Sequence, residues 1–198
     1  MLTPPPSLRY AILPSPLGPL LAACDVDGAL TKLSFDAVLP PGAIIDEAAF
    51  AELREALERY FAKEPVDFRT LKVAPLGSDY QQDVWAALKE IPHGATLSYG
   101  DLAWRVGSNP RSVGQANGQN PIAIVIPCHR VIGADGGLVG YAGGIDRKRK
   151  LLVLEGSPRS SPRQSARCVR YRHRIGAVFS ARHAARGRVR GQHRPPAR

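Results

Sequence analysis

Apolar residues in the first 75 positions follow two periods, one typical of strands and one typical of a helix. Two apolar segments, RYAILPSPLGPLLAAC and ALTKLSF, lie within residues 8–36 and flank the turn-forming pair Asp27-Gly28, which predicts a small antiparallel sheet. Over residues 47–62 the spacing becomes helical, and Asp46 is placed to cap that helix. The apolar residues of the helix are expected to pack in a core, and they are Phe50, Leu53, Leu57, Tyr60 and Phe61.

A less regular crossing ends near residue 75, where we place a domain boundary. Just beyond it, Ser78 and Gln81 have the spacing of a capping box, which predicts a helix that continues to about Ile91. The sequence Pro-His-Gly then ends this helix. Its histidine, His93, stands alone beside a glycine, so we interpret it as a solvent-facing turn residue.

Two short helices joined by a glycine-containing turn are predicted next. Ser98 is placed to cap the first, which ends at Gly107, and Asn109 caps the second with Pro110 at its first position. This order is typical of a helix-turn-helix, although helical hairpins also occur in ordinary domains. The second helix is expected to approach a nucleic-acid groove closely and to place Arg111 in a base stack. Its small and polar face consists of Arg111, Ser112, Gly114, Gln115, Ala116, Asn117 and Gly118.

The sequence NPIAIVIPCHRV, at residues 120–131, places a cysteine and a histidine after a short apolar run. Residues 122–126 are rich in β-branched side chains and predict a strand covered on both faces, which Pro127 ends. Asn120 is expected to form an Asx turn that joins the preceding helix to this strand. Cys128 is then expected on a constrained turn, with its thiol partly buried but still accessible.

Cys128 is the candidate nucleophile because its sequence neighbours suit an activated thiol. A thiol reacts as its thiolate, and the adjacent His129 and Arg130 are residue types that lower its pKa or accept its proton. The alternative is a structural role, since a free cysteine is usually a small buried hydrophobe. The proline stop, the neighbouring cation and the glycine-rich segment that follows favour the chemical role.

Composition narrows the setting in which such a thiol operates. The three cysteines, Cys24, Cys128 and Cys168, are widely spaced and odd in number, so they predict neither a disulfide framework nor a structural zinc site. The first residues lack the pattern of a signal peptide, and no apolar run is long enough to span a membrane. We therefore expect a reducing, cytoplasmic location and no membrane partner.

The basic charge of the chain belongs to its last 42 residues. Residues 157–198 contain 12 arginines and no acidic residue, whereas residues 1–156 contain 15 basic and 17 acidic residues. The total charge of +10 therefore does not make the whole protein a basic nucleic-acid binder. The tail has no apolar periodicity and is predicted to be disordered. It is either an arm that binds polyphosphate or an extension with little selected function.

A final helix is predicted over the sequence RKRKLLVLEG, with Asp146 as its cap. Its leucines pack inward, whereas its four cations form a basic face that is either merely solvated or adds attraction to phosphates. Glu155 lies at the end of this helix among leucines, where a carboxylate needs a partner, and His129 is the candidate. The cations are Arg147, Lys148, Arg149 and Lys150.

The motif PCHRV, preceded by NPIAIVI and followed by GYAGG and RKRKLLVLEG, resembles the signature region of the O6-alkylguanine-DNA alkyltransferases, the methylated-DNA–protein-cysteine methyltransferases. The resemblance is almost continuous from about Ser78 to Gly156, and the sheet-plus-helix part is similar in order to the family's first domain. It implies an α+β fold with domains at residues 1–75 and 76–156, followed by a disordered tail at 157–198. The second domain is then mainly helical, with the helix-turn-helix and the active-site cysteine.

Roles for single residues also follow from this resemblance. It implies that Cys128 accepts the alkyl group, that His129 is the base reaching it through a bound water, and that Glu155 orients His129. Asn120 matches the hinge asparagine and Tyr99 the tyrosine that helps to rotate the nucleotide, with a hydroxyl placed to donate a proton. The expected DNA contacts are Arg111, Ser112, Gly114, Gln115, Asn117 and Arg130, and the expected base pocket is Tyr141, Ala142, Gly143 and Gly144.

The chain departs from the family pattern at three places. The segment between Tyr99 and Arg111 is shorter, Pro110 replaces the usual small residue, and Ala142 resembles bacterial members. The zinc ligands of some members have no counterpart, so neither a metal nor a cofactor is expected.

The expected reaction is repair of O6-alkylguanine, with O4-alkylthymine left open as a second substrate. An alkyl group on O6 of guanine is unreachable in the stack, so the nucleotide must be flipped out of the duplex, and the resulting thioether is stable. We therefore expect a monomer that acts once on double-stranded DNA. The alternative is a helix-turn-helix protein that senses alkylated DNA without repairing it; a cysteine hydrolase is disfavoured because no oxyanion site is evident.

Overall fold

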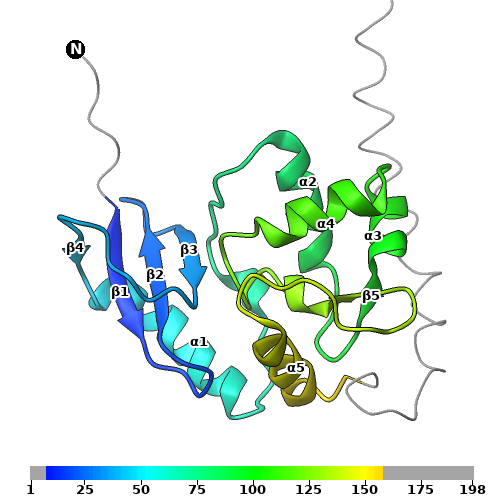
Figure 1. Cartoon of the computed structure of the whole chain (residues 1–198). Coiled ribbons are helices and arrows are strands. Elements are labelled where there is room, and N and C mark those ends of the chain that lie inside the picture. The colour runs from blue at the N-terminus through cyan, green and yellow to red at the C-terminus, as the bar shows by residue number, and fades with distance from the viewer. Residues whose placement is uncertain (1–7, 158–198) are drawn as a thin grey trace, which may run out of the picture.

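The computed structural model describes residues 8–157 and is built around a sheet at one side and a group of helices at the other (Figure 1). The expected α+β architecture is confirmed. The predictions for residues 158–198, including the disordered tail, lie outside the described residues.

The N-terminal sheet has four strands in the order β3-β2-β1-β4. The first three are antiparallel, as predicted, whereas the short β4 pairs parallel with β1 and makes the sheet mixed. Between β2 and β3, Asp25 Oδ1 accepts hydrogen bonds from the backbone N–H of Asp27 and of Ala29, and Gly28 adopts a φ of 76°. The strands are β1 (Arg9–Leu13), β2 (Leu20–Cys24), β3 (Leu30–Ser34) and β4 (Ile44–Ile45).

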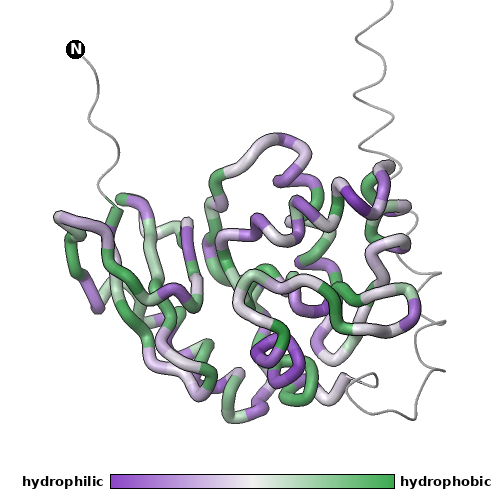
Figure 2. The backbone as a smooth tube through the Cα atoms, in the orientation of Figure 1, coloured by the Kyte–Doolittle hydropathy of each residue, from purple (hydrophilic) through white to green (hydrophobic). Residues whose placement is uncertain are grey.

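The helix expected over residues 47–62 begins with the 3-10 turn η1 (Ala48–Phe50) and continues as α1 (Ala51–Phe61). Asp46 Oδ1 accepts the backbone N–H of Ala49 at 3.2 Å, but the residue directly before η1 is Glu47, whose side chain makes no capping hydrogen bond. The helix lies beside the sheet (Figure 1), and both hydrophobic and hydrophilic residues occur along it (Figure 2). Its apolar stripe is buried in a core shared with the sheet. Phe61 is partly buried, and the fully buried members are Phe50, Leu53, Leu57 and Tyr60.

The helix predicted to begin at Ser78 is α2 (Asp79–Lys89), which the 3-10 turn η2 (Phe68–Thr70) precedes in the chain. Ser78 and Gln81 form the predicted capping box, because each side chain hydrogen-bonds the backbone N–H of the other. The indole N–H of Trp85 donates to Ala116 O at 2.9 Å and so connects α2 to the second short helix. His93 is exposed in the turn that follows, as predicted.

The helix-turn-helix is present as α3 (Tyr99–Arg105) and α4 (Pro110–Gly118). Ser98 caps α3 through the backbone N–H of Asp101, and Asn109 caps α4 through that of Ser112, as the sequence predicted. One short strand precedes this unit in the chain and another follows it, and the two pair in parallel. They are β5 (Leu97–Ser98) and β6 (Val131–Ile132).

Asn109→Ala is expected to lower the free energy of unfolding by about 1 kcal/mol, because α4 loses its N-cap hydrogen bond. Urea unfolding measures the change. Asn109→Ser, which keeps a capping oxygen, should recover most of it, and equal losses in both variants would contradict the capping role.

The strand predicted at residues 122–126 is wrong, although the predicted burial is right. Ile122 forms only an isolated bridge with Leu33 of β3, and a tight turn follows it. In that turn Ile126 N–H donates to Ile122 O at 3.0 Å, and Ile124 adopts a φ of 70°. Because a β-branched residue rarely adopts a positive φ, the packing around this buried side chain must hold it there.

The chain continues through the 3-10 turn η3 (Cys128–Arg130) and ends its described part with α5 (Ile145–Leu154). Leu151 and Leu152 of α5 are buried, and the helix lies against η3. Its first turn is not capped by Asp146, because the N-cap position is Gly144 and has no side-chain hydrogen bond. None of the helices within residues 8–157 is long and apolar enough to cross a membrane.

Candidate active site

Cys128 begins η3 and is almost completely buried. Burial raises the pKa of its thiol, while a hydrogen bond from Asn120 and the charge of Lys148 act in the opposite direction. The thiol is therefore protonated at rest, and reaction requires a base close to it.

The Asn120 side chain connects the end of α4 to this sulfur. Its Oδ1 accepts the backbone N–H of Ile122 at 3.0 Å, which is the predicted Asx turn. Its Nδ2 donates to Ile126 O at 2.8 Å and lies 3.0 Å from Cys128 Sγ. One amide thus fixes the irregular turn and supplies a donor to the nucleophile.

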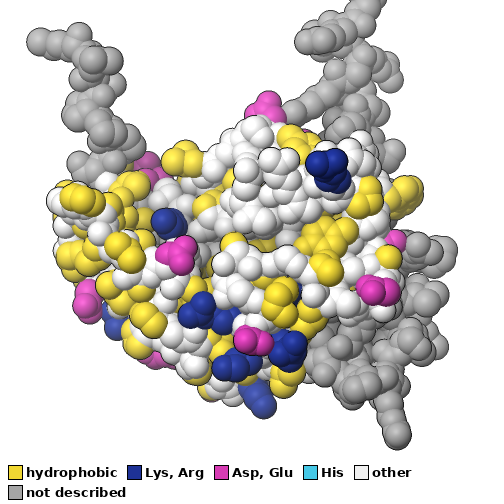
Figure 3. Space-filling model, in the orientation of Figure 1, with side chains coloured by type: hydrophobic (Ala, Val, Ile, Leu, Met, Phe, Trp, Pro, Cys, Tyr) yellow, Lys and Arg dark blue, Asp and Glu magenta, His cyan; other side chains and the backbone are white. Residues whose placement is uncertain are grey.

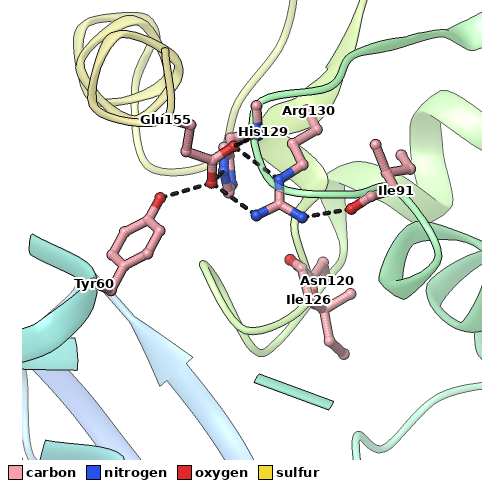
Figure 4. A network of polar contacts seen from close by, with 8 residues as sticks. Tyr60, Ile91, Asn120, Ile126, His129, Arg130 and Glu155 are labelled. Carbon is pink, nitrogen blue, oxygen red and sulfur yellow. Dashed lines mark hydrogen bonds and ion pairs between the residues drawn. The ribbon is translucent and has the colours of Figure 1, made fainter. Parts of the chain in front are cut away.

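His129, which follows Cys128 in the chain, forms a buried pair with Glu155 (Figure 4). His129 Nε2 lies 2.9 Å from Glu155 Oε1, and the other ring nitrogen, Nδ1, is buried without a hydrogen-bond partner in the described part of the chain. Burial lowers the pKa of His129 although Glu155 raises it. Since His129 is largely neutral, its ring can accept a proton.

Glu155 also binds Arg130, which corrects the expectation that Arg130 contacts DNA. The guanidinium reaches both carboxylate oxygens, at 2.9 Å from Nε to Oε2 and 2.8 Å from Nη2 to Oε1, and it also donates to Ile91 O. Burial opposes ionisation of Glu155, but His129 and Arg130 outweigh it and lower its pKa well below the usual value. Arg130 is buried because this carboxylate needs a permanent cation, so its side chain does not face solvent.

Tyr60 of α1 is the third side chain that hydrogen-bonds Glu155, with its hydroxyl 2.8 Å from Oε1 (Figure 4). The sequence pattern indicated only core packing for Tyr60. Its partner stands 95 positions away, so no local signal marks the hydroxyl as part of a site.

Lys148 does not lie on the basic face that the sequence predicted for α5. Its side chain is buried, and Nζ donates to Val139 O at 2.8 Å and to Gly140 O at 3.3 Å. Nζ also lies 5.8 Å from the centre of the Tyr99 ring. Burial lowers the pKa of Lys148 to about 8, against a smaller opposing effect of Cys128. The ammonium therefore adds positive charge close to the thiol.

The other cations of α5 remain at or near the surface. On the face shown in Figure 3, cationic side chains gather over α5. Arg149 and Lys150 are exposed, whereas Arg147 is partly buried and donates to Leu17 O at 2.9 Å. Arg147 thus joins α5 to the N-terminal sheet region.

Two tyrosines, Tyr99 and Tyr141 of the glycine-rich segment, are close enough to Cys128 to interact with it electrostatically. The Tyr99 hydroxyl lies 3.4 Å from Val139 O, and burial raises its pKa, with the nearby Cys128 acting in the same direction. Burial also raises the pKa of Tyr141, and its buried hydroxyl has no hydrogen-bond partner within residues 8–157. Both phenols are therefore protonated donors at neutral pH.

Glycines 143 and 144 are required by the backbone around Tyr141. A Cβ atom at Gly143 would lie 2.7 Å from Cε1 of Tyr141 and 3.0 Å from Cδ2 of Phe35, so a side chain does not fit. Gly144 has a φ of 89°, which favours glycine, and Ala142 between Tyr141 and Gly143 is exposed. The segment expected as the base pocket thus packs closely around the Tyr141 ring.

The arrangement combines a thiol, a neutral imidazole, an ionised carboxylate and protonated phenols. Such a set supports proton removal from sulfur and nucleophilic attack. No group of three His, Cys, Asp or Glu side chains within residues 8–157 is placed to hold a metal ion.

Comparisons with known proteins agree with this chemistry. The 6-O-methylguanine DNA methyltransferase family matches twice, its ribonuclease-like domain at residues 8–75 and its DNA-binding domain at 79–157. A methylated-DNA–protein-cysteine methyltransferase of Methanosarcina acetivorans is 49% identical over 158 residues, which cover 76% of this chain and 99% of the relative. This chain belongs to the 6-O-methylguanine DNA methyltransferase family.

Solved structures of relatives have the same fold as this methyltransferase. The O6-methylguanine methyltransferase of Mycobacterium tuberculosis is 44% identical with a TM-score of 0.69, over 79% of this chain and 96% of the relative. A complex of the M. tuberculosis protein with DNA is 45% identical with a TM-score of 0.70, over 75% of this chain and 92% of the relative.

In the methyltransferase, α4 presents most but not all of its predicted face to solvent. Arg111, Gln115 and Gly118 are exposed, and Ser112 and Gly114 are half-buried. Ala116 and Asn117 are buried, because with Val113 they form the inward stripe of the helix. Asn117 Nδ2 lies 3.4 Å from the Tyr99 hydroxyl and 3.5 Å from Cys128 O. Asn117 therefore faces the active site, and its expected place on the exposed face was wrong.

Proposed function

We propose that this methyltransferase repairs duplex DNA by moving an alkyl group, most simply methyl, from O6 of guanine to Cys128. The observation that carries the proposal is the buried Cys128 thiol, which lies 3.0 Å from Asn120 Nδ2 and directly precedes the buried His129 of the His129–Glu155 pair in the chain. The family match and the exposed α4 of a helix-turn-helix support duplex DNA as the partner. O4-alkylthymine stays open as a second substrate.

The first step is activation of the thiol. His129 accepts the Cys128 proton at the ring nitrogen that Glu155 does not engage, directly or through water. The resulting imidazolium is stabilised by the ionised Glu155, which Arg130 keeps charged. Lys148 stabilises the developing thiolate through its charge.

The second step is substitution at the alkyl carbon. The sulfur–carbon bond forms as the bond from carbon to O6 breaks, and guanine takes the electron pair of that bond. The Tyr99 hydroxyl, whose raised pKa keeps it protonated, supplies a proton to the leaving base, and the proton taken by His129 restores the balance. The sum converts a thiol and an alkylguanine into a thioether and guanine.

Access to the sulfur requires the nucleotide to leave the duplex, which costs roughly a few kcal/mol. Arg111 on the exposed surface of α4 is proposed to fill the vacated stack and offset part of this cost. Ser112, Gly114 and Gln115 follow it on the same helix and are proposed to line the groove contact. The base then lies between Tyr99 and the segment around Tyr141, with Ala142, Gly143 and Gly144 at its edge.

Each molecule acts once, because regenerating Cys128 would require a nucleophile to attack the alkyl carbon of a stable thioether and expel the cysteine thiolate. We expect intact-mass measurement after incubation with a duplex containing O6-methylguanine to show a gain of one methyl group per chain. Cys128→Ala should show none, while Cys24→Ala, which removes the other described thiol, should gain the methyl group normally. An unmodified wild-type chain would refute the proposal.

A sensor of alkylated DNA that performs no repair is the second candidate. It shares the helix-turn-helix but has no need of a buried thiol that is hydrogen-bonded by Asn120 and followed by a buried histidine. We also propose, for the repair function, the reducing, cytoplasmic location that the sequence led us to expect, since such a location would keep Cys128 as a thiol.

A further inference from the structure

Tyr60 brings a hydroxyl from the N-terminal half of the chain into the active-site network. Its ring is buried and packs against Phe61 and Phe68, with ring centres 5.2 Å and 5.4 Å apart. Burial, followed by the neighbouring Glu155, raises the pKa of Tyr60, so the hydroxyl is protonated and can donate at neutral pH. The donated hydrogen bond to Glu155 Oε1 is 2.8 Å long (Figure 4).

Glu155 Oε1 is shared among three donors. It accepts from Tyr60 at 2.8 Å, from Arg130 Nη2 at 2.8 Å and from His129 Nε2 at 2.9 Å. Oε2 accepts from Arg130 Nε and, at 3.4 Å, from the backbone N–H of Gly94. Each donor withdraws charge from the carboxylate, so each weakens the attraction that the same oxygen exerts on the imidazole.

A buried carboxylate paired with an imidazole alone would favour the imidazolium form. An imidazolium has donors at both ring nitrogens, so it cannot accept the proton of Cys128. A base beside a buried carboxylate therefore needs other groups that share the carboxylate charge. Arg130 supplies one such group with a full charge, and Tyr60 supplies a neutral one.

We propose that Tyr60 is a positioning residue of the methyltransferase, which shares the charge of Glu155 and thereby keeps His129 neutral and able to act as the base. This inference rests on the proposed function, because only a transferase needs that base. The N-terminal half of the chain would then contribute one side chain to the proton-transfer network of Cys128, His129 and Glu155.

Other ionisable groups lie close to the His129–Glu155 pair, and some of them also influence the pKa of His129. Arg130 of η3 and Lys148 of α5 lie near His129, and their positive charges disfavour a second cation there. Tyr141 from the glycine-rich segment is close enough to Glu155 to interact with it electrostatically. Tyr60→Phe changes none of these groups and keeps the buried ring.

The direction of the expected effect follows from the loss of one donor. Without the Tyr60 hydroxyl, Glu155 Oε1 becomes a stronger acceptor for the His129 N–H, the imidazolium is stabilised and the His129 pKa rises. We expect a rise of about half a pH unit, which lowers the transfer rate about threefold on the acid side of the profile. At higher pH, where His129 is neutral in both proteins, the rates should agree within about twofold.

The test is a pH titration of His129 by NMR on the full chain labelled with 15N-histidine, in the absence of DNA. The protein has five histidines, and loss of one signal in His129→Asn identifies the right one. Tyr60→Phe should raise the midpoint, while Tyr10→Phe, a change in β1, should not. Single-turnover transfer is then followed over the same pH range.

An unchanged or lowered midpoint in Tyr60→Phe would overturn the inference, and so would a rate loss that is equal at every pH, since that is the mark of a merely structural role. If Tyr60→Phe does not fold, 3-fluorotyrosine at position 60 is the second variant. Its more acidic hydroxyl is a stronger donor, so the midpoint should fall, and a rise would refute the inference. Absence of methyl transfer in the wild type would instead refute the proposed function, because the titration is independent of DNA.

Discussion

Arg130→Met is expected to lower the free energy of unfolding by about 3–5 kcal/mol, because it leaves the buried Glu155 carboxylate without its permanent cation. The variant also removes the donor to Ile91 O, which then stays buried and unpaired. Urea unfolding followed by circular dichroism measures the loss.

Arg149→Met is the matched control for Arg130→Met. Arg149 pairs with Asp146 at 3.0 Å, but both side chains are exposed, at 58% and 84%, so the pair is expected to contribute about 0–1 kcal/mol. Similar losses in the two variants would contradict the buried role of Arg130. The salt dependence of duplex binding should be unchanged in folded Arg130→Met, since Arg130 does not reach phosphates.

Glu155→Gln is expected to slow alkyl transfer about a hundredfold, because a neutral amide neither stabilises the imidazolium nor fixes the ring of His129. Duplex binding should be nearly intact, since Glu155 is buried away from the exposed surface of α4. Single-turnover rates with an O6-methylguanine duplex measure the first effect, and titration of a labelled duplex measures the second.

Asp146→Asn provides the control for loss of one carboxylate, because Asp146 lies on the exposed first turn of α5. Its transfer rate should equal that of the wild type. Equal rates in Glu155→Gln and the wild type would refute the relay role, and parallel losses of binding and transfer would indicate a general structural defect.

Local signals in the sequence predicted the helices and their caps. Ser78, Ser98 and Asn109 are capping residues whose effect is confined to the next three positions, so spacing alone identified α2, α3 and α4. The pairing of Glu155 with His129 was also predictable, because a carboxylate among leucines needs a partner.

The errors concern properties that the tertiary packing decides. Residues 122–126 are apolar and β-branched, which indicates burial, but burial is compatible with a tight turn that the surroundings enforce. Arg130 and Lys148 are charged residues, which usually predict exposure. Each is buried because it has a partner: the Glu155 carboxylate binds Arg130, and two carbonyl oxygens bind Lys148. Asn117 lies on the inward stripe of a nine-residue helix, where the choice of face depends on the neighbouring helices.

Leu33 of β3 pairs with the turn before Cys128 and so connects the N-terminal sheet to the active site. Leu33 N–H donates to Pro121 O at 2.9 Å, and Ala123 N–H donates to Leu33 O at 2.8 Å. Opening of β3 breaks these two bonds, which connect the sheet to the turn leading to Cys128. The amide protons of Leu33 and Ala123 should therefore exchange with solvent in one cooperative event, and we expect the parts of the chain on either side of residue 75 to open together.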